Sequence, residues 1–124
     1  MRPAEDSSTP TIAEVVHRAA EVCDPTGVEE AAAHLLDRFE DRDEPVTAAP
    51  DLAQQLEEAK GAIDPQDEDA VAVMTVAVAT YLAYRRTALD TDRDELLRLA
   101  ARAEFDGKPA EPVAGWLADQ DIEL

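Results

Sequence analysis

Two histidines, one cysteine and many carboxylates are the residues of this chain that could carry chemistry. Glu14 and His17 have the spacing with which helical di-iron proteins present a glutamate and a histidine to a metal. On a helix, however, His17 falls on the same polar side as Glu14, away from the apolar stripe. His34 likewise falls between Glu30 and Asp37 on a polar face. We therefore expect both histidines to be solvated, and we predict no metal, no cofactor and no catalytic residue.

Cys23, the single cysteine, lies on an apolar stripe and is expected to be a packed thiol. A nucleophilic cysteine needs a base and an electropositive setting, and the neighbouring residues here are acidic. One cysteine cannot form an internal disulfide, which fits a reducing cytoplasm. The sequence also has no glycine-rich phosphate loop, no paired-cysteine zinc motif and no G-x-S-x-G. These observations argue against an enzyme.

Acidic residues dominate the composition. The chain has 29 Asp and Glu against 11 Lys and Arg, for a net charge of −18. In dilute buffer such a charge repels itself and destabilises the compact state. At about 1 M salt the Debye length falls to about 3 Å and the repulsion is screened. The same charge disfavours a nucleic-acid partner or an anionic membrane, because both need a basic surface.

Dense carboxylates, scarce lysine and abundant alanine and valine resemble the composition of proteins from halophilic archaea. A high-GC actinobacterial genome also raises alanine and lowers lysine, but there we would expect more arginine. The resemblance implies adaptation to high salt, and it assigns no site residue. The first residues, MRPAEDSST, contain no apolar segment, so we predict no signal peptide and a cytoplasmic location.

One apolar run, AVAVMTVAVATYLAY at residues 70–84, is expected to be the central element against which the other helices pack. Its length and interleaved alanines favour a helix over a strand, and we place this helix at about 65–89, with Asp64 as N-cap and Pro65 in the first turn. Because the run is apolar all round, neighbours must cover it on several sides. Fifteen helical residues span about 22 Å, short of the roughly 30 Å hydrocarbon core, so a buried helix is favoured over a membrane span. Small residues at heptad-like spacing could seat a neighbouring helix from the same chain or from a symmetric copy: Ala72, Val76, Ala79 and Ala83.

Capping signals and apolar stripes predict the remaining helices. Capping boxes are expected at Thr11 with Glu14 and at Thr26 with Glu29. A third helix should begin at Pro50 and end at Gly61, a fifth should follow Asp92, and a last one should begin at Pro109 or Pro112. The stripe of the fifth helix is expected to be Leu96, Leu99, Ala100 and Ala103.

The domain organisation follows from these elements. Residues 1–9 are expected to be a flexible tail, and residues 41–49 are the best linker candidate, because they combine dense charge with a proline. The sequence therefore predicts an all-α fold in one domain over residues 10–124. Its form would be a compact bundle of five or six helices around the central, fully buried apolar helix.

Charge is spread unevenly, with six basic and six acidic residues between positions 81 and 108, so the rest of the chain carries the whole −18. A neutral surface on an acidic protein is where another molecule can approach with little repulsion. The alternative is a set of local salt bridges around the turn near residue 90. The arginines that could face a partner are Arg85, Arg86, Arg93, Arg98 and Arg102.

Three functional hypotheses remain. The first is a non-catalytic interaction or structural module, adapted to high salt, that binds a protein partner or forms a homodimer through the neutral stretch. The second is a regulator with a helix-turn-helix-like pair, in which the basic helix near 92–105 supplies Arg93, Arg98 and Arg102 as contacts. The third is a small metal-binding or enzymatic helical protein. The regulator requires Arg98 and Arg102 on one accessible face, and the metal protein requires the histidines to converge with carboxylates.

Overall fold

Six α-helices and one short 3₁₀-helix form the part of the chain described by the structure, a computed structural model covering residues 10–63, 69–85, 91–106, 108–109 and 111–122. No strand occurs within these ranges, so the predicted all-α bundle is confirmed. The predicted tail, residues 1–9, lies outside them. The elements are α2 (Ile12–Cys23), α3 (Glu30–Phe39), η1 (Val46–Ala48), α4 (Leu52–Ile63), α5 (Ala70–Arg85), α6 (Arg93–Phe105) and α7 (Glu111–Asp119).

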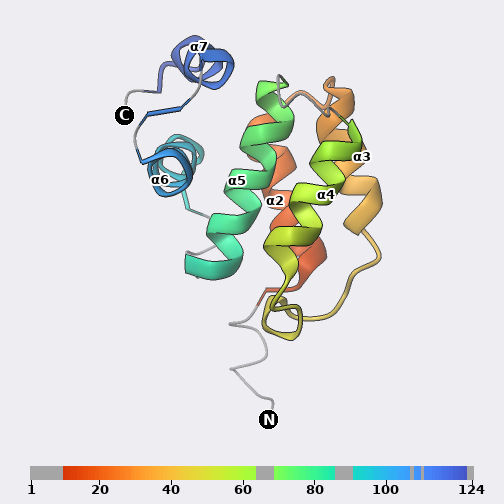
Figure 1. The fold of residues 1–124 in the computed structure, drawn as a ribbon. Helices are drawn as coiled ribbons and strands as arrows, with labels where there is room; N and C mark the ends of the chain where they lie inside the picture. Colours follow the sequence, from red (N-terminus) through yellow and green to blue (C-terminus); the bar gives the residue numbers. More distant parts are fainter. Residues whose placement is uncertain (1–9, 64–68, 86–90, 107, 110, 123–124) are drawn as a thin grey trace.

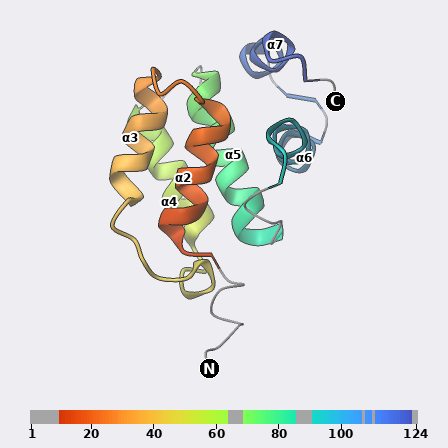
Figure 2. The same cartoon turned by 180° about the vertical axis from the view of Figure 1, so that it is seen from behind.

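Helix α5 is the centre of the molecule, as predicted, because it packs against all five other helices. Figure 1 shows α5 in front of α2, with α4 on one flank and α6 on the other. Figure 2, from behind, shows α2 and α3 side by side and α6 and α7 to one side of this bundle. The residues expected to seat a neighbouring helix are buried within this chain, so helices of the same chain cover them: Ala72, Val76, Ala79 and Ala83.

Helix α5 begins at Ala70, five residues later than predicted from Pro65. The carboxylate of Asp69 accepts hydrogen bonds from the backbone N–H groups of Val71 (3.0 Å) and Ala72 (3.1 Å). It satisfies first-turn donors that no helical carbonyl can reach; Asp64 and Pro65, the predicted start, lie outside the described residues. The predicted end of the helix near residue 89 lies outside the described residues.

The start of α2 confirms its predicted capping box. Thr11 Oγ1 accepts from the Glu14 N–H at 3.1 Å, and Glu14 Oε1 accepts from the Thr11 N–H at 2.8 Å. The carbonyl oxygens of Arg42 and Glu44 accept from Ala13 (2.9 Å) and Ile12 (3.0 Å) in the same turn. The 41–49 segment therefore connects α3 and α4 while its backbone is bonded to the start of α2.

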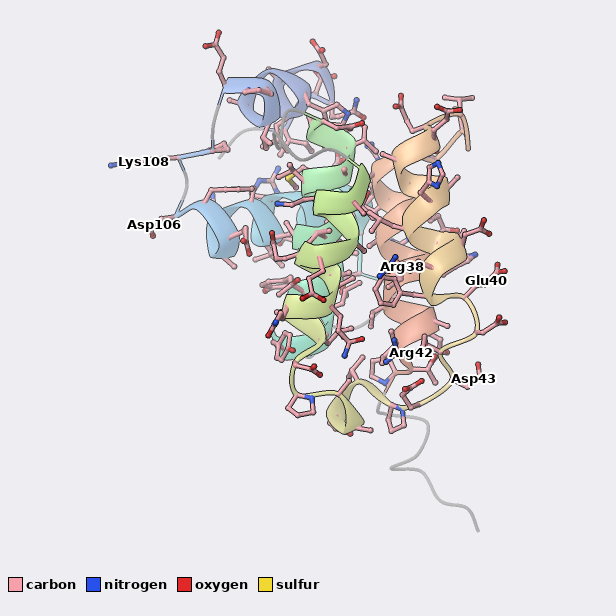
Figure 3. The ribbon with its side chains drawn as sticks, turned by 45° about the vertical axis from the view of Figure 1, so that its right-hand side comes forward. Arg38, Glu40, Arg42, Asp43, Asp106 and Lys108 are labelled. Carbon is pink, nitrogen blue, oxygen red and sulfur yellow. The ribbon has the colours of Figure 1, made fainter. Side chains whose placement is uncertain are left out.

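The side chain of Arg42 also holds this segment in place. Its Nη1 donates to Gln55 Oε1 of α4 at 3.0 Å, and its Nε lies 3.1 Å from Glu44 Oε2. Figure 3 shows Arg42 directed toward the helices, while Glu40 and Asp43 point away from them. Hydrogen bonds from both the backbone and the Arg42 side chain thus attach the predicted linker to α2 and α4.

Two local predictions are wrong in detail. No side chain caps α3 at Thr26; instead the carboxylate of Asp24 accepts from the N–H groups of Val28 (3.1 Å) and Glu29 (3.0 Å). Val28, just before α3, is 73% exposed. Gly61 lies inside α4 rather than at its end.

Helix α6 is rotated relative to its predicted stripe. Asp92 caps it as predicted, accepting from the Asp94 N–H at 3.2 Å, and Asp106 ends it in a left-handed conformation with φ of 56°. Its buried residues are Leu96, Leu97, Ala100 and Ala101, whereas Leu99 is only partly buried and Ala103 is exposed. Where the structure describes the chain, none of its helices combines the length and apolar character needed to cross a bilayer.

Candidate functional site

Among the five arginines expected to face a partner, the three whose side chains the structure describes do not share one surface: Arg93, Arg98 and Arg102. Arg85 is the last residue of α5, and Arg86 lies outside the described residues. Arg93 begins α6 and points into the molecule, whereas Arg98 and Arg102 lie on the outer side of the same helix. The described arginines of this set are therefore divided between an internal contact, made by Arg93, and an external pair.

Arg93 links three helices. Its Nε donates to the carbonyl oxygen of Val22 at the end of α2 (2.6 Å), and its Nη2 donates to Gln120 Oε1, just after α7 (2.6 Å). Its Nη1 lies 3.7 Å from Asp94 Oδ1, and its side chain is 28% exposed. Because most of its donors are used within the chain, its main role is to hold α6 in place.

Arg98 and Arg102 are four residues apart and project from the outer side of α6. Arg98 pairs with Glu95 at 3.2 Å, and 31% of its side chain is exposed. Arg102 is exposed. This pair is accessible, but part of its charge is neutralised on the same helix.

An uncharged stretch of surface lies instead along α5. No charged residue occurs between Ala70 and Tyr84, and four side chains on one side of the helix are not fully covered: Val73, Thr80, Tyr81 and Tyr84. In Figure 1 no described helix crosses in front of α5 between α4 and α6. Helix α5 is therefore buried over most of its surface but leaves one apolar side accessible.

A hollow opens on this side, which we call the α5 hollow. Its volume is about 280 Å³, and its lining residues are Ala77, Thr80, Tyr81 and Tyr84 of α5 and Ala100, Ala103 and Glu104 of α6. Ala77 is 2% exposed and forms the floor. The four α5 residues are related as i, i+3, i+4 and i+7, so they lie together on one helical face.

Tyr84 is held at the rim of the α5 hollow. Tyr84 is 45% exposed, yet its hydroxyl donates a hydrogen bond to the carbonyl oxygen of Pro50 at 3.1 Å. The same hydroxyl accepts from the N–H of Ala53 in the first turn of α4 at 3.0 Å. These bonds anchor the tyrosine to α4 and pre-form the rim. Sequence reasoning missed this site because it expected α5 to be covered on every side.

The α4 edge beside this surface is neutral overall. Ala53, Glu57 and Lys60 follow one face of α4 at i, i+4 and i+7, and the hydrogen bond from the backbone N–H of Ala53 to Tyr84 holds the first turn of α4 against α5. Lys60 Nζ lies 2.9 Å from Glu57 Oε1, and Lys60 is buried. The pair carries no net charge, so the uncharged surface extends from α5 toward α4.

A second hollow, polar and about 880 Å³ in volume, lies between α3 and α4. Acidic and basic side chains line it together with His34: Glu30, Asp37, Arg38, Glu40 and Asp69. His17 and His34 are both exposed and lie on different helices. Within the described ranges no group of three or more histidines, cysteines and carboxylates is placed to hold a metal ion.

Cys23 is buried beside Thr75 of α5. Burial raises the pKa of its thiol to about 12, although a hydrogen bond with Thr75 and the charge of Arg93 act in the opposite direction. A thiol of this kind is protonated at neutral pH and inaccessible, so it is a packing residue rather than a nucleophile.

Comparisons with protein-family models, with curated proteins and with solved structures find no match for this chain.

Proposed function

We propose that this protein is a non-catalytic interaction module whose α5 hollow receives a side chain from a helix of a protein partner. The observation that carries this proposal is the arrangement of Ala77, Thr80, Tyr81 and Tyr84 around one hollow. In packed helices, a side chain of one helix inserts between four residues of the other that have this spacing. An accessible hollow of this form on a protein surface is therefore complementary to another helix.

The size and polarity of the hollow support an apolar occupant. A volume of about 280 Å³ accommodates an aliphatic or aromatic side chain, and the tyrosine rings and alanines that line it offer apolar contact area. Exposed apolar surface rimmed by polar residues is typical of interaction sites. Charged molecules are disfavoured, because Glu104 is the one charged residue among the lining residues that the structure describes.

The large negative charge of the chain favours partner binding at high salt. This agrees with the proposed adaptation to high salt and with a salt-rich cytoplasm. A partner that carries many carboxylates of its own would be repelled by the −18 charge in dilute buffer. At about 1 M salt that repulsion is screened to a few ångströms, whereas apolar burial in the hollow remains favourable.

A helix-turn-helix regulator has less support. The second helix of such a pair enters the major groove, and α7 contains no lysine or arginine but carries Glu111 and Asp119. Of the three arginines expected as contacts, Arg93 is bonded to Val22 and Gln120. The remaining pair, Arg98 and Arg102, offers few phosphate contacts for the affinity that DNA binding requires.

Site-specific photo-crosslinking tests the proposal. A benzophenone amino acid replaces Ala103, an exposed residue in the wall of the α5 hollow, and in a matched control it replaces Ala33, an exposed residue of α3. Irradiation in the native host at native salt should give a defined protein adduct from position 103 and none from position 33. Equal labelling at both positions, or no adduct at position 103, would overturn the proposal.

A further inference from the structure

We infer that the helix received by the α5 hollow is α5 of a second copy of this chain, antiparallel to the first and centred on Ala77. This inference rests on the proposed function and identifies the partner as a second copy of the chain.

The accessible side of α5 has matched large and small residues on either side of Ala77. Val73 and Tyr81 stand four residues before and after Ala77, and Ala70 and Tyr84 stand seven residues before and after it. In a two-fold symmetric pair, residue i contacts residue j while j contacts i. An antiparallel pair centred on Ala77 therefore places Val73 opposite Tyr81 and Ala70 opposite Tyr84, so that each large side chain meets a smaller one.

This pairing also supplies an occupant for the hollow. Val73 of each copy would lie at the level of Thr80 and Tyr81 of the other, inside the ring formed by Ala77, Thr80, Tyr81 and Tyr84. Val73 is partly buried on its own chain and has apolar surface left to bury. Symmetry fills both hollows at once, which doubles the apolar area removed from water.

The charges along this surface permit the approach of an identical, strongly acidic molecule. Residues 70–84 contribute no charge, and on the edge of α4 Lys60 and Glu57 form an ion pair at 2.9 Å. Glu104, in the wall of the α5 hollow, is the one charge among the lining residues that the structure describes, so each hollow brings a single carboxylate to the contact. Residues 1–9 of the same chain, MRPAEDSST, are mostly polar, and Met1 is their only large apolar side chain.

Sedimentation equilibrium in about 2 M KCl measures the association directly. We expect the full chain to be a dimer, and we expect Thr80→Glu to weaken the dimer at least about tenfold, because it brings two carboxylates into the interface. Ala33→Glu, on the exposed side of α3, adds the same charge and should leave the dimer intact. A wild-type chain that stays monomeric at about 100 µM would overturn the inference, as would equal weakening by both variants.

Disulfide trapping distinguishes the antiparallel pair from a parallel one. With a helical rise of about 1.5 Å per residue, Val73 of one copy is within about 2 Å of the level of Thr80 in the other, but about 12 Å from the level of Val73 itself. A disulfide needs Cα atoms within about 7 Å. Oxidising a mixture of Val73→Cys and Thr80→Cys proteins should therefore link one to the other. Either protein oxidised alone should stay unlinked, and the buried Cys23 leaves the wild type as a blank.

Two outcomes separate this inference from the proposed function. If each single-cysteine protein links to itself, the copies are parallel and the inference is wrong. If the photo-adduct at position 103 has the mass of the chain plus a different protein, the hollow binds a partner but the partner is not a second copy. If position 103 gives no adduct, the proposed function fails and takes the inference with it.

Discussion

The Nε of Arg93 donates a 2.6 Å hydrogen bond to the carbonyl oxygen of Val22. Val22 lies in the last turn of α2, where helical carbonyls have no intrahelical donor. A second arginine acts in the same region, since Arg18 Nη2 donates to the carbonyl oxygen of Thr91 at 2.7 Å. The chain has few cations, and these two are used to join α2 to the segment that begins α6.

Replacing Arg93 should therefore be costly. Arg93→Ala removes the bonds to Val22 and Gln120 and is expected to lower the free energy of unfolding by about 3 kcal/mol, since bonds to charged donors are worth about 1.5–3 kcal/mol each. Arg102→Ala, from an exposed residue of the same helix, should change it by less than about 0.5 kcal/mol. Urea unfolding followed by circular dichroism measures both, and equal losses would show that Arg93 does not hold α6.

The turn between α2 and α3 should depend on one carboxylate. Asp24→Ala leaves the N–H groups of Val28 and Glu29 without their acceptor and should destabilise the protein by about 1–2 kcal/mol, as loss of a helix cap does. The control is Asp37→Ala on the exposed side of α3, which removes the same charge. If both variants lose the same stability in urea, the contribution of Asp24 is general charge rather than capping.

Stability should fall at alkaline pH because of Cys23. Burial raises the pKa of its thiol from 9.0 to about 12, so the unfolded chain releases this proton first. The stabilising contribution is complete below about pH 9 and is lost as the pH rises toward 12, at about 1.4 kcal/mol per pH unit. Cys23→Ala should be less stable at pH 8 but should lose less stability between pH 8 and pH 10 than the wild type. Parallel losses over that interval in urea titrations would contradict the assignment.

Salt should stabilise the fold. Raising KCl from about 0.1 M to about 2 M at neutral pH is expected to raise Tm by at least about 5 °C, because it screens the −18 charge. At about pH 4 many carboxylates are protonated, so the same change in KCl should raise Tm by less. Differential scanning calorimetry measures both series. A Tm that rises equally at the two pH values would indicate a general salt effect instead of relief of repulsion.

The helical bundle could be predicted from the sequence because its signals are local. The uninterrupted apolar run of α5, the capping box of Thr11 with Glu14 and the Asp92 cap each act within one or two turns. Where two local signals compete, the sequence cannot rank them. Asp64-Pro65 and Asp69 are both good helix starts, and the structure uses Asp69 because it lies directly before the apolar run.

The candidate site could not be predicted because it depends on how helices settle against one another. Apolar residues cover much of α6, so its pattern permits more than one buried face, and packing selects Leu97 and Ala101 over Leu99 and Ala103. The same choice puts Ala103 in the wall of the α5 hollow. Likewise, the charge of Arg93 is visible in the sequence, but the Val22 carbonyl that it reaches is 71 residues away.

If the α5 hollow receives a helix, a charge placed inside the hollow should reduce crosslinking from position 103. The yield of the photo-adduct at position 103 is therefore compared in two variants of the protein. In the Thr80→Glu background the charge lies inside the hollow, whereas in the Ala33→Glu background it lies on α3. We expect the first variant to lower the yield at least about tenfold and the second to leave it unchanged, with both proteins folded by circular dichroism. Equal yields in the two backgrounds would contradict the proposal.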